Sequence, residues 1–183
     1  MRAMTPISGD TTMGELLQAY PGAQRALFAR YHIGGCKSCG FSPNETLAGV
    51  CTRNENIPVE EAIAHIQSSH DSDAKIQLSP TEFAEWKDKP GTRVLDVRTA
   101  EEHDAVKIPG SARLTQELIQ EAFSTWDKTQ PVLFYDHMGA QSLDIAAYFI
   151  GHGFSETKCL AGGINAYSEQ VDPSLPRYFI ELE

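Results

Sequence analysis

Hydrophobic residues in the first part of the chain, up to about His70, recur at the three- and four-residue spacing of helices with one buried face. The pattern predicts short helices over residues 12–20, 23–31, 43–52 and 58–67. Thr12 with Glu15, and Ser42 with Glu45, have the spacing of capping boxes, so each pair is expected to start a helix. Short helices on so few residues bury a small core, and we expect something besides packing to help hold it.

The pattern changes after a polar, unpatterned segment at residues 71–75, which we interpret as a linker. Continuous apolar runs rich in β-branched and aromatic residues, at 93–97 and 132–135, predict buried parallel strands. Helical patterns lie in the same part of the chain, at residues 80–87, 115–126 and 141–151. Alternating strands and helices indicate a parallel sheet covered on both faces. The predicted organisation is an all-α domain, a linker and an α/β domain at residues 1–70, 71–75 and 76–183.

The charge balance narrows the classes of partner. With 15 basic and 25 acidic residues the chain carries a formal charge of -10, which argues against nucleic acid because phosphate binding needs a basic surface. No apolar run reaches the roughly 18 residues of a membrane span. The first twenty residues also lack the apolar core of a signal peptide. We therefore expect a cytoplasmic protein without a membrane partner.

Three of the four cysteines lie close together in the sequence, at Cys36, Cys39 and Cys51. Cys36 and Cys39 form a C-x-x-C pair, which suits zinc, an iron–sulfur cluster or a reversible disulfide. Cys51 is the candidate third metal ligand. A fourth ligand would come from a second subunit, which makes an oligomer conceivable, or from one of the histidines His32, His65 and His70. The alternative is that these cysteines are reduced and bind nothing.

The residues around the C-x-x-C pair have a family resemblance. The matching segments are residues 13–17, 20–23, 27–28, 31–33 and 45–47. They are similar to the N-terminal segment of iron–sulfur cluster repair proteins and to a cysteine-bearing domain associated with hybrid-cluster proteins. The repair proteins usually carry adjacent cysteines, so the C-x-x-C spacing is closer to the second relative. The resemblance implies a role in iron–sulfur, sulfur or nitrosative-stress chemistry.

The second part of the chain resembles the rhodanese domain in four ordered blocks. These blocks are residues 94–103, 108–112, 132–135 and 160–167. The resemblance implies a rhodanese-like, parallel five-stranded sheet flanked by helices, with the active-site loop after the strand at 132–135. Residues 171–178 are similar to the tail of rhodanese domains fused to glutaredoxins.

The loop that corresponds to the family's active site departs from the family pattern. Its residues are Asp136, His137, Met138, Gly139, Ala140 and Gln141. The resemblance puts Asp136 in place of the cysteine that holds sulfane sulfur as a persulfide, and a carboxylate cannot do so. A related phosphatase would also need an arginine at the position of Ser142. We expect no standard thiosulfate sulfurtransferase activity, and none of the loop residues is assigned a catalytic role.

The carboxylate of Asp136 is expected to fold over its own loop and accept hydrogen bonds from inward-facing backbone N–H groups and a helix N-terminus. An exposed aspartate without a role is the simple alternative. An acyl-phosphate nucleophile is disfavoured, because no metal-site carboxylate lies nearby in the sequence. Cys159 is interpreted as a small buried hydrophobe rather than a replacement nucleophile. Asp96 and Arg98 are interpreted as a structural pair.

Taken together, these patterns predict a catalytically degenerate rhodanese-homology protein. It would be a binding or regulatory partner of another protein in sulfur relay or iron–sulfur cluster maintenance. The alternative is a thiol-dependent sulfurtransferase or redox enzyme that uses Cys36 and Cys39. A third possibility is an interaction module whose cysteines are inert.

Overall fold

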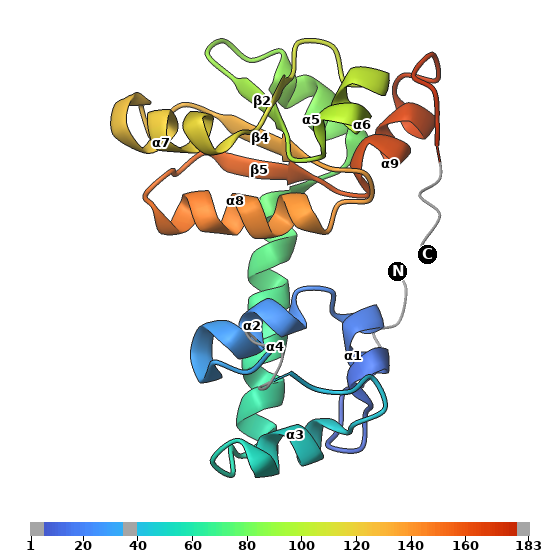
Figure 1. The fold of residues 1–183 in the computed structure, drawn as a ribbon, viewed down its shortest axis with the longest axis vertical. Coiled ribbons are helices and arrows are strands. Elements are labelled where there is room, and N and C mark those ends of the chain that lie inside the picture. The colour runs from blue at the N-terminus through green and yellow to red at the C-terminus, as the bar shows by residue number, and fades with distance from the viewer. Residues whose placement is uncertain (1–5, 35–39, 179–183) are drawn as a thin grey trace. The chain divides into compact units, whose positions relative to one another are not determined.

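The computed structural model describes residues 6–34 and 40–178, and these residues divide into two compact units. We call Met1–Ala74 the N-terminal unit and Lys75–Glu183 the C-terminal unit. Each unit has its own hydrophobic core, and each is described separately (Figure 1). No helix in the described part of the chain is both long enough and apolar enough to cross a membrane.

The described part of the N-terminal unit is helical. Its helices are α1 (Met13–Ala19), α2 (Ala23–Tyr31), α3 (Leu47–Arg53) and α4 (Val59–Ile76), whose last two residues belong to the C-terminal unit. Their apolar faces meet in a core that includes Met13, Leu16, Leu27, Leu47, Val50 and Ile66, all buried. The capping box predicted at Thr12 and Glu15 is confirmed, since each side chain accepts a hydrogen bond from the other residue's backbone N–H. The helical pattern of the sequence is therefore realised, with two differences in its boundaries.

The first difference concerns the third helix, which was predicted over residues 43–52 with a cap at Ser42. The helix begins at Leu47 instead, and the Thr46 side chain caps it by accepting a hydrogen bond from the Gly49 N–H. The backbone just before it pairs with the start of α1, where Gly14 donates to the Pro43 carbonyl at 2.8 Å. This pairing holds the segment outside the helix, so the prediction at Ser42 was wrong.

The second difference concerns residues 71–75, which were predicted to be an unpatterned linker. They belong to α4, which continues helically to Ile76. Asp73, 3% exposed, accepts a hydrogen bond from Arg25 of α2 at 2.7 Å. This contact joins two helices across 48 positions of the sequence, and it gives the buried Asp73 carboxylate a partner that a local pattern cannot reveal.

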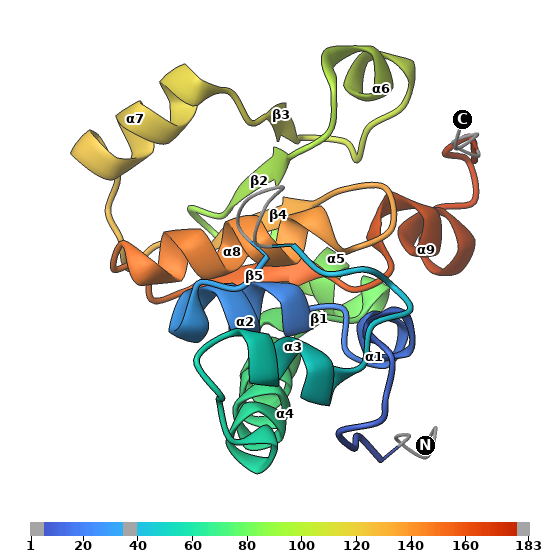
Figure 2. The same ribbon diagram turned by 60° about the horizontal axis from the view of Figure 1, so that its bottom comes forward.

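The C-terminal unit is built on one five-stranded sheet with all neighbouring strands parallel. The strands are β1 (Gln77–Leu78), β2 (Arg93–Asp96), β3 (Ala112–Arg113), β4 (Val132–Tyr135) and β5 (Thr157–Leu160). They lie in the order β1-β5-β4-β2-β3, so that β4 is central and the two-residue strands form the edges (Figures 1 and 2). The expected rhodanese-like sheet class is confirmed.

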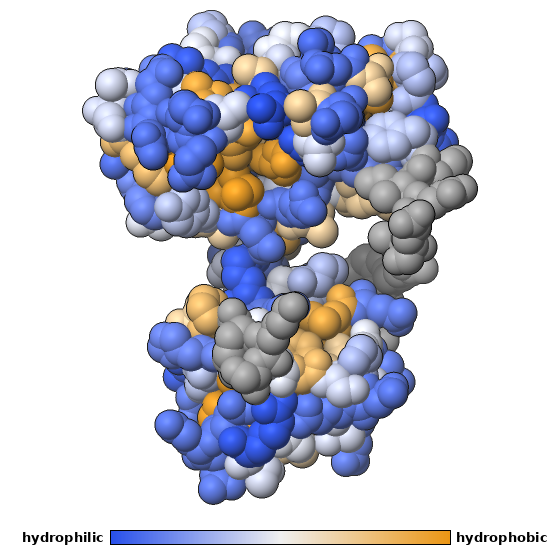
Figure 3. Space-filling model, viewed as in Figure 1, coloured by the Kyte–Doolittle hydropathy of each residue, from blue (hydrophilic) through white to orange (hydrophobic). Residues whose placement is uncertain are grey.

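Helices cover both faces of this sheet. They are α5 (Pro80–Lys87), α6 (Ala100–Ala105), α7 (Gln116–Thr125), α8 (Gln141–Gly151) and α9 (Gly163–Gln170). Along β4, Val132 and Phe134 pack in the core with α7 and α8, whereas Leu133 and Tyr135 pack in the core with α5 and α9. This alternation is the two-residue period of a strand. Figure 3 shows apolar side chains reaching the surface on the face that carries α7 and α8.

The register of the strands brings their carboxyl ends to one edge. Asp96 at the end of β2 is aligned with Tyr135 at the end of β4, and Phe134 is aligned with Cys159 of β5. Cys159 is fully buried in the apolar core, as its interpretation as a small hydrophobe requires. In parallel sheets, ligands bind beyond the carboxyl ends of the strands, so this edge is where a functional site is expected.

Candidate functional site

The loop between β4 and α8, residues 136–140, lies at the carboxyl edge of the sheet and is organised around one carboxylate. Asp136 is 4% exposed, and its Oδ1 accepts hydrogen bonds from the Gly139 N–H at 2.5 Å and from Ser142 Oγ at 3.1 Å. Its Oδ2 accepts from the Gln141 N–H at 2.7 Å and the Ser142 N–H at 3.4 Å. The carboxylate therefore occupies the centre of its own loop, in the orientation expected from the sequence.

The N-terminus of α8 contributes to this arrangement. The helix begins at Gln141, and Ala140 at the N-cap position provides no side-chain cap. The first N–H groups of a helix lack partners within the helix and carry the positive end of its dipole. Asp136 satisfies two of them, at Gln141 and Ser142, and thus takes the place of both a capping residue and a bound anion.

A second turn, at Gly162 and Gly163, packs directly against this loop. The Ile164 N–H donates to the Asp136 carbonyl at 2.8 Å. A Cβ atom at Gly163 would lie 2.4 Å from the His137 carbonyl. The φ of 61° at Gly163 also disfavours any residue other than glycine there. A Cβ atom at Gly139 would lie 2.7 Å from the Gly162 nitrogen. The close contact between the two turns fixes the backbone of the loop.

His137 lies beside the carboxylate but faces the C-terminal segment. Its ring centroid is 4.5 Å from that of Tyr178, and its buried Nδ1 has no hydrogen-bond partner among the described residues. The Tyr178 hydroxyl accepts a hydrogen bond from Arg98 at 2.8 Å and donates one to Glu102 at 2.7 Å. His137 is thus partly buried, whereas Met138 next to it is 59% exposed.

Arg98 belongs to a buried ion pair that anchors the turn after β2. Its guanidinium binds both carboxylate oxygens of Asp96, at 2.9 and 2.6 Å, and Asp96 also lies 2.8 Å from His103 Nδ1. Burial opposes ionisation of Asp96, but hydrogen bonds from Arg98 and His103 outweigh it and hold the pKa of Asp96 below its usual value. The interpretation of Asp96 and Arg98 as a structural pair is confirmed.

The predicted ligands of the N-terminal unit are only partly visible. Cys36 and Cys39 lie outside the described residues. Cys51 is 1% exposed in the apolar core of its unit, and burial raises the pKa of its thiol. His32 is exposed at the C-terminus of α2, with φ at 57°.

The other two candidate ligands have structural contacts. His65 Nε2 lies 2.9 Å from the Ala26 carbonyl, and His70 packs edge-on against Tyr20. Among residues 6–34 and 40–178, no three His, Cys, Asp or Glu side chains are arranged to hold a metal ion. The described members of the proposed ligand set therefore do not form a metal site by themselves.

The sequence interpretation missed Tyr178 and Ser142 as parts of this site. Ser142 was considered only as the position of a missing arginine, although its N–H and Oγ both reach Asp136. Tyr178 is 80 residues from Arg98 and 76 from Glu102, so no local pattern signals the contact. The similarity of residues 171–178 to a rhodanese tail was the one available hint.

Comparison with known proteins agrees with this geometry. The model of the rhodanese-like domain matches residues 79–170. The chain is 26% identical over 175 residues to the adenylyltransferase and sulfurtransferase UBA4 of Lodderomyces elongisporus, which covers 87% of this chain and 38% of that protein. It is 28% identical over 99 residues to the thiosulfate sulfurtransferase GlpE of Pseudoalteromonas translucida, which covers 52% and 94%, respectively.

The chain thus spans less than half the length of the first of these relatives and nearly all of the second. Among solved structures, reduced Bacillus anthracis CoADR-RHD aligns with a TM-score of 0.50 at 16% identity, over 66% of this chain and 21% of that one, a likeness of fold alone. The sheet order, the loop after β4 and the matched residues lead to one conclusion: the chain belongs to the family of rhodanese-like domains, with the family domain at residues 79–170.

Proposed function

We propose that this protein is a catalytically degenerate member of the family, a binding or regulatory partner of another protein in sulfur relay or iron–sulfur cluster maintenance. The proposal rests on one observation: the carboxylate of Asp136 fills the loop after β4 and accepts hydrogen bonds from the Gly139, Gln141 and Ser142 N–H groups. In the family this place belongs to a cysteine.

The chemistry of the loop supports this view. Sulfane sulfur is carried as a persulfide on a nucleophilic thiolate, and a carboxylate has no sulfur to form that bond. Residues 136–142 contain no cysteine. Cys159 of β5 is 0% exposed and lies in the apolar core, where a substrate cannot reach it. The inward N–H groups that could stabilise a bound anion are already satisfied by Asp136.

The C-x-x-C pair supplies the second part of the proposal. Cys36 and Cys39 would bind zinc or an iron–sulfur cluster, carry sulfur, or switch between thiol and disulfide. The degenerate domain would then dock the partner protein. The thiols also support the alternative, a sulfurtransferase or redox enzyme that uses Cys36 and Cys39, because they belong to a motif that favours reactive thiolate.

A sulfur-transfer assay on the full chain tests the first part. Wild-type protein is incubated with thiosulfate and cyanide, and thiocyanate is measured beside the variants Asp136→Cys and Asp136→Ser. We expect no turnover above background for wild type and Asp136→Ser, and turnover for Asp136→Cys, because only a thiol can take the sulfur. An inactive Asp136→Cys that folds normally would show that the loop lacks the family's working geometry.

The same assay distinguishes the degenerate protein from the alternative, a thiol enzyme that uses Cys36 and Cys39. Wild-type turnover that disappears in Cys36→Ser would show that the protein is a thiol enzyme and would overturn the degenerate assignment. Metal analysis and thiol counting on anaerobically isolated protein address the binding role. Bound iron or stoichiometric zinc would support it, whereas colourless protein that takes up one sulfane sulfur per chain would favour the enzyme.

A further inference from the structure

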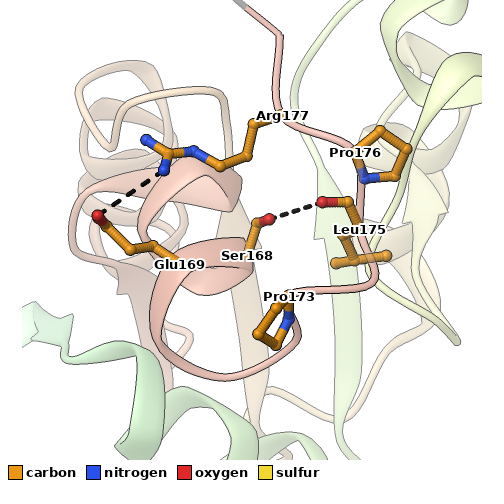
Figure 4. Close-up of a pocket in the computed structure, with 6 residues that line it drawn as sticks. All are labelled: Ser168, Glu169, Pro173, Leu175, Pro176 and Arg177. Carbon is orange, nitrogen blue, oxygen red and sulfur yellow. Dashed lines mark hydrogen bonds and ion pairs between the residues drawn. The ribbon is translucent and has the colours of Figure 1, made fainter.

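The described part of the C-terminal unit ends in a segment that crosses from α9 to the loop after β4. We call residues 171–178 the strap. It is tied to α9 by two side-chain hydrogen bonds. Ser168 Oγ donates to the Leu175 carbonyl at 2.7 Å (Figure 4). Arg177 Nε donates to Asn165 Oδ1 at 3.0 Å. Each contact joins the strap to one side of the helix, and together they direct its end towards the loop.

The middle of the strap is largely exposed, at Pro173, Ser174, Pro176 and Arg177, whereas Leu175 packs against the core of the C-terminal unit. A hollow of about 390 Å³ lies between it and α9, lined by Ser168, Glu169, Pro173, Leu175, Pro176 and Arg177 (Figure 4). The two prolines have no N–H to donate, so they add no backbone hydrogen bond to the attachment. The ion pair of Arg177 with Glu169 is long, at 3.7 Å, and both side chains are exposed, so it contributes little. Before Tyr178, the strap is thus held by Val171 and Leu175 against the core and by the two hydrogen bonds to α9.

The end of the strap is held more tightly, by Tyr178. Its hydroxyl lies between a donor and an acceptor, Arg98 at 2.8 Å and Glu102 at 2.7 Å. The same carboxylate of Glu102 caps α6 through Thr99 with its other oxygen, so the acceptor is fixed in place. Arg98 is fixed by Asp96. The phenol therefore lies in a rigid polar setting that belongs to the C-terminal unit's own framework.

The Tyr178 ring packs against His137 of the loop. The two ring centroids are 4.5 Å apart with planes at 36°, and the buried His137 Nδ1 has no hydrogen-bond partner within residues 6–34 and 40–178. A buried polar atom without a partner is costly, and water or a ligand group would satisfy it if the cover moved. The contact with Tyr178 thus keeps His137 Nδ1 away from water, at an energetic cost.

We propose that the strap is an autoinhibitory cover: Tyr178, seated between Arg98 and Glu102, closes the loop at His137, and its release opens the loop to a partner. This inference rests on the proposed function, since it describes how access to the same loop is regulated. The exposed middle of the strap would allow its release, and the hydrogen bonds at Tyr178 define the closed state.

Histidine labelling of the full chain tests the cover. Diethyl pyrocarbonate modification is followed peptide by peptide, with the exposed residues His32 and His152 as internal references. In wild type, His137 is expected to react several-fold more slowly than the references, because its ring packs against Tyr178 and its Nδ1 is buried. In Tyr178→Ala, His137 should approach the reference rate while the references are unchanged. Tyr178→Phe, which keeps the ring but lacks the hydroxyl, should lie between the two.

Two results would overturn the proposal. One is a wild-type His137 that reacts as fast as His152, a result that needs no variant to fold. The other is a folded Tyr178→Ala protein in which His137 stays protected. A second comparison, Asp136→Cys with and without Tyr178→Ala, should show faster sulfur transfer without the tyrosine. If wild-type protein transfers sulfur and loses this activity in Cys36→Ser, but His137 is uncovered by Tyr178→Ala, the proposed function fails and the cover stands.

Discussion

Replacing Asp136 by asparagine keeps the size of the side chain but removes the charge and one acceptor oxygen. Each carboxylate oxygen now receives two donors, Gly139 N–H with Ser142 Oγ at Oδ1 and the Gln141 and Ser142 N–H groups at Oδ2. In either amide orientation the NH₂ group faces donors. The Ser142 hydroxyl can turn to accept from the amide, but a backbone N–H cannot.

The size of the effect follows from these contacts. Hydrogen bonds to a charged acceptor contribute about 1.5–3 kcal/mol each, and a buried donor left without a partner costs about 1–3 kcal/mol. With at least one backbone donor orphaned and the charge lost, we expect Asp136→Asn to destabilise the C-terminal unit by about 3 kcal/mol. At a urea dependence of about 2 kcal/mol per molar, the unfolding midpoint should fall by about 1.5 M.

Tryptophan fluorescence during urea unfolding measures this unit selectively, because Trp86 and Trp126, the chain's two tryptophans, both lie in it. Asp104→Asn is the matched control: the same chemical change at an exposed position of α6, expected to stay within about 0.5 kcal/mol of wild type. A midpoint for Asp136→Asn equal to that of the control would refute the reasoning, because it would mean that the carboxylate is not held by the loop.

Two further predictions use the same fluorescence assay. Gly163→Ala should destabilise the C-terminal unit by about 2 kcal/mol or more, because the new Cβ atom would clash with the His137 carbonyl and because Gly163 has a positive φ. The control is Gly151→Ala at the end of α8, where a Cβ atom meets no neighbour, and it should be neutral or slightly stabilising. Equal effects of the two substitutions would contradict the close packing of the two turns. The pKa of Asp96 is lowered in the folded state, so its contribution is complete above the unfolded pKa of about 3.9 and is lost as the pH falls through the folded value. Stability should therefore decline below about pH 4 in wild type and more gently in Asp96→Asn, and parallel curves would argue against this linkage.

Local sequence signals were sufficient where a structural element depends on its own residues. The helices Pro80–Lys87 and Gln141–Gly151 have the bounds that the pattern predicts, and the central strand Val132–Tyr135 follows from its continuous apolar run. The orientation of Asp136 was also predictable, because its donors lie within six residues of it. In these cases the residues that make the contacts are neighbours in the chain.

The sequence failed where distant residues decide the outcome. Ser42 and Glu45 have the spacing of a capping box, but the carbonyls of Pro43 and Glu45 are taken by N–H groups of α1. The extension of α4 through residues 71–75 includes the ion pair of the buried Asp73 with Arg25, and the position of Tyr178 depends on Arg98 and Glu102. Strands of two residues, such as β1 and β3, are too short to give a period and become visible only through their pairing.

Those short strands have a consequence for recognition. The unpaired N–H and C=O groups of an edge strand can pair with another polypeptide as a further strand, and proteins limit this pairing by keeping their edge strands short. Here both rims consist of only two residues, Gln77–Leu78 on one side and Ala112–Arg113 on the other. A partner polypeptide could form very few backbone hydrogen bonds with these edge strands, so we expect any protein that binds this sheet to contact side chains and loops instead.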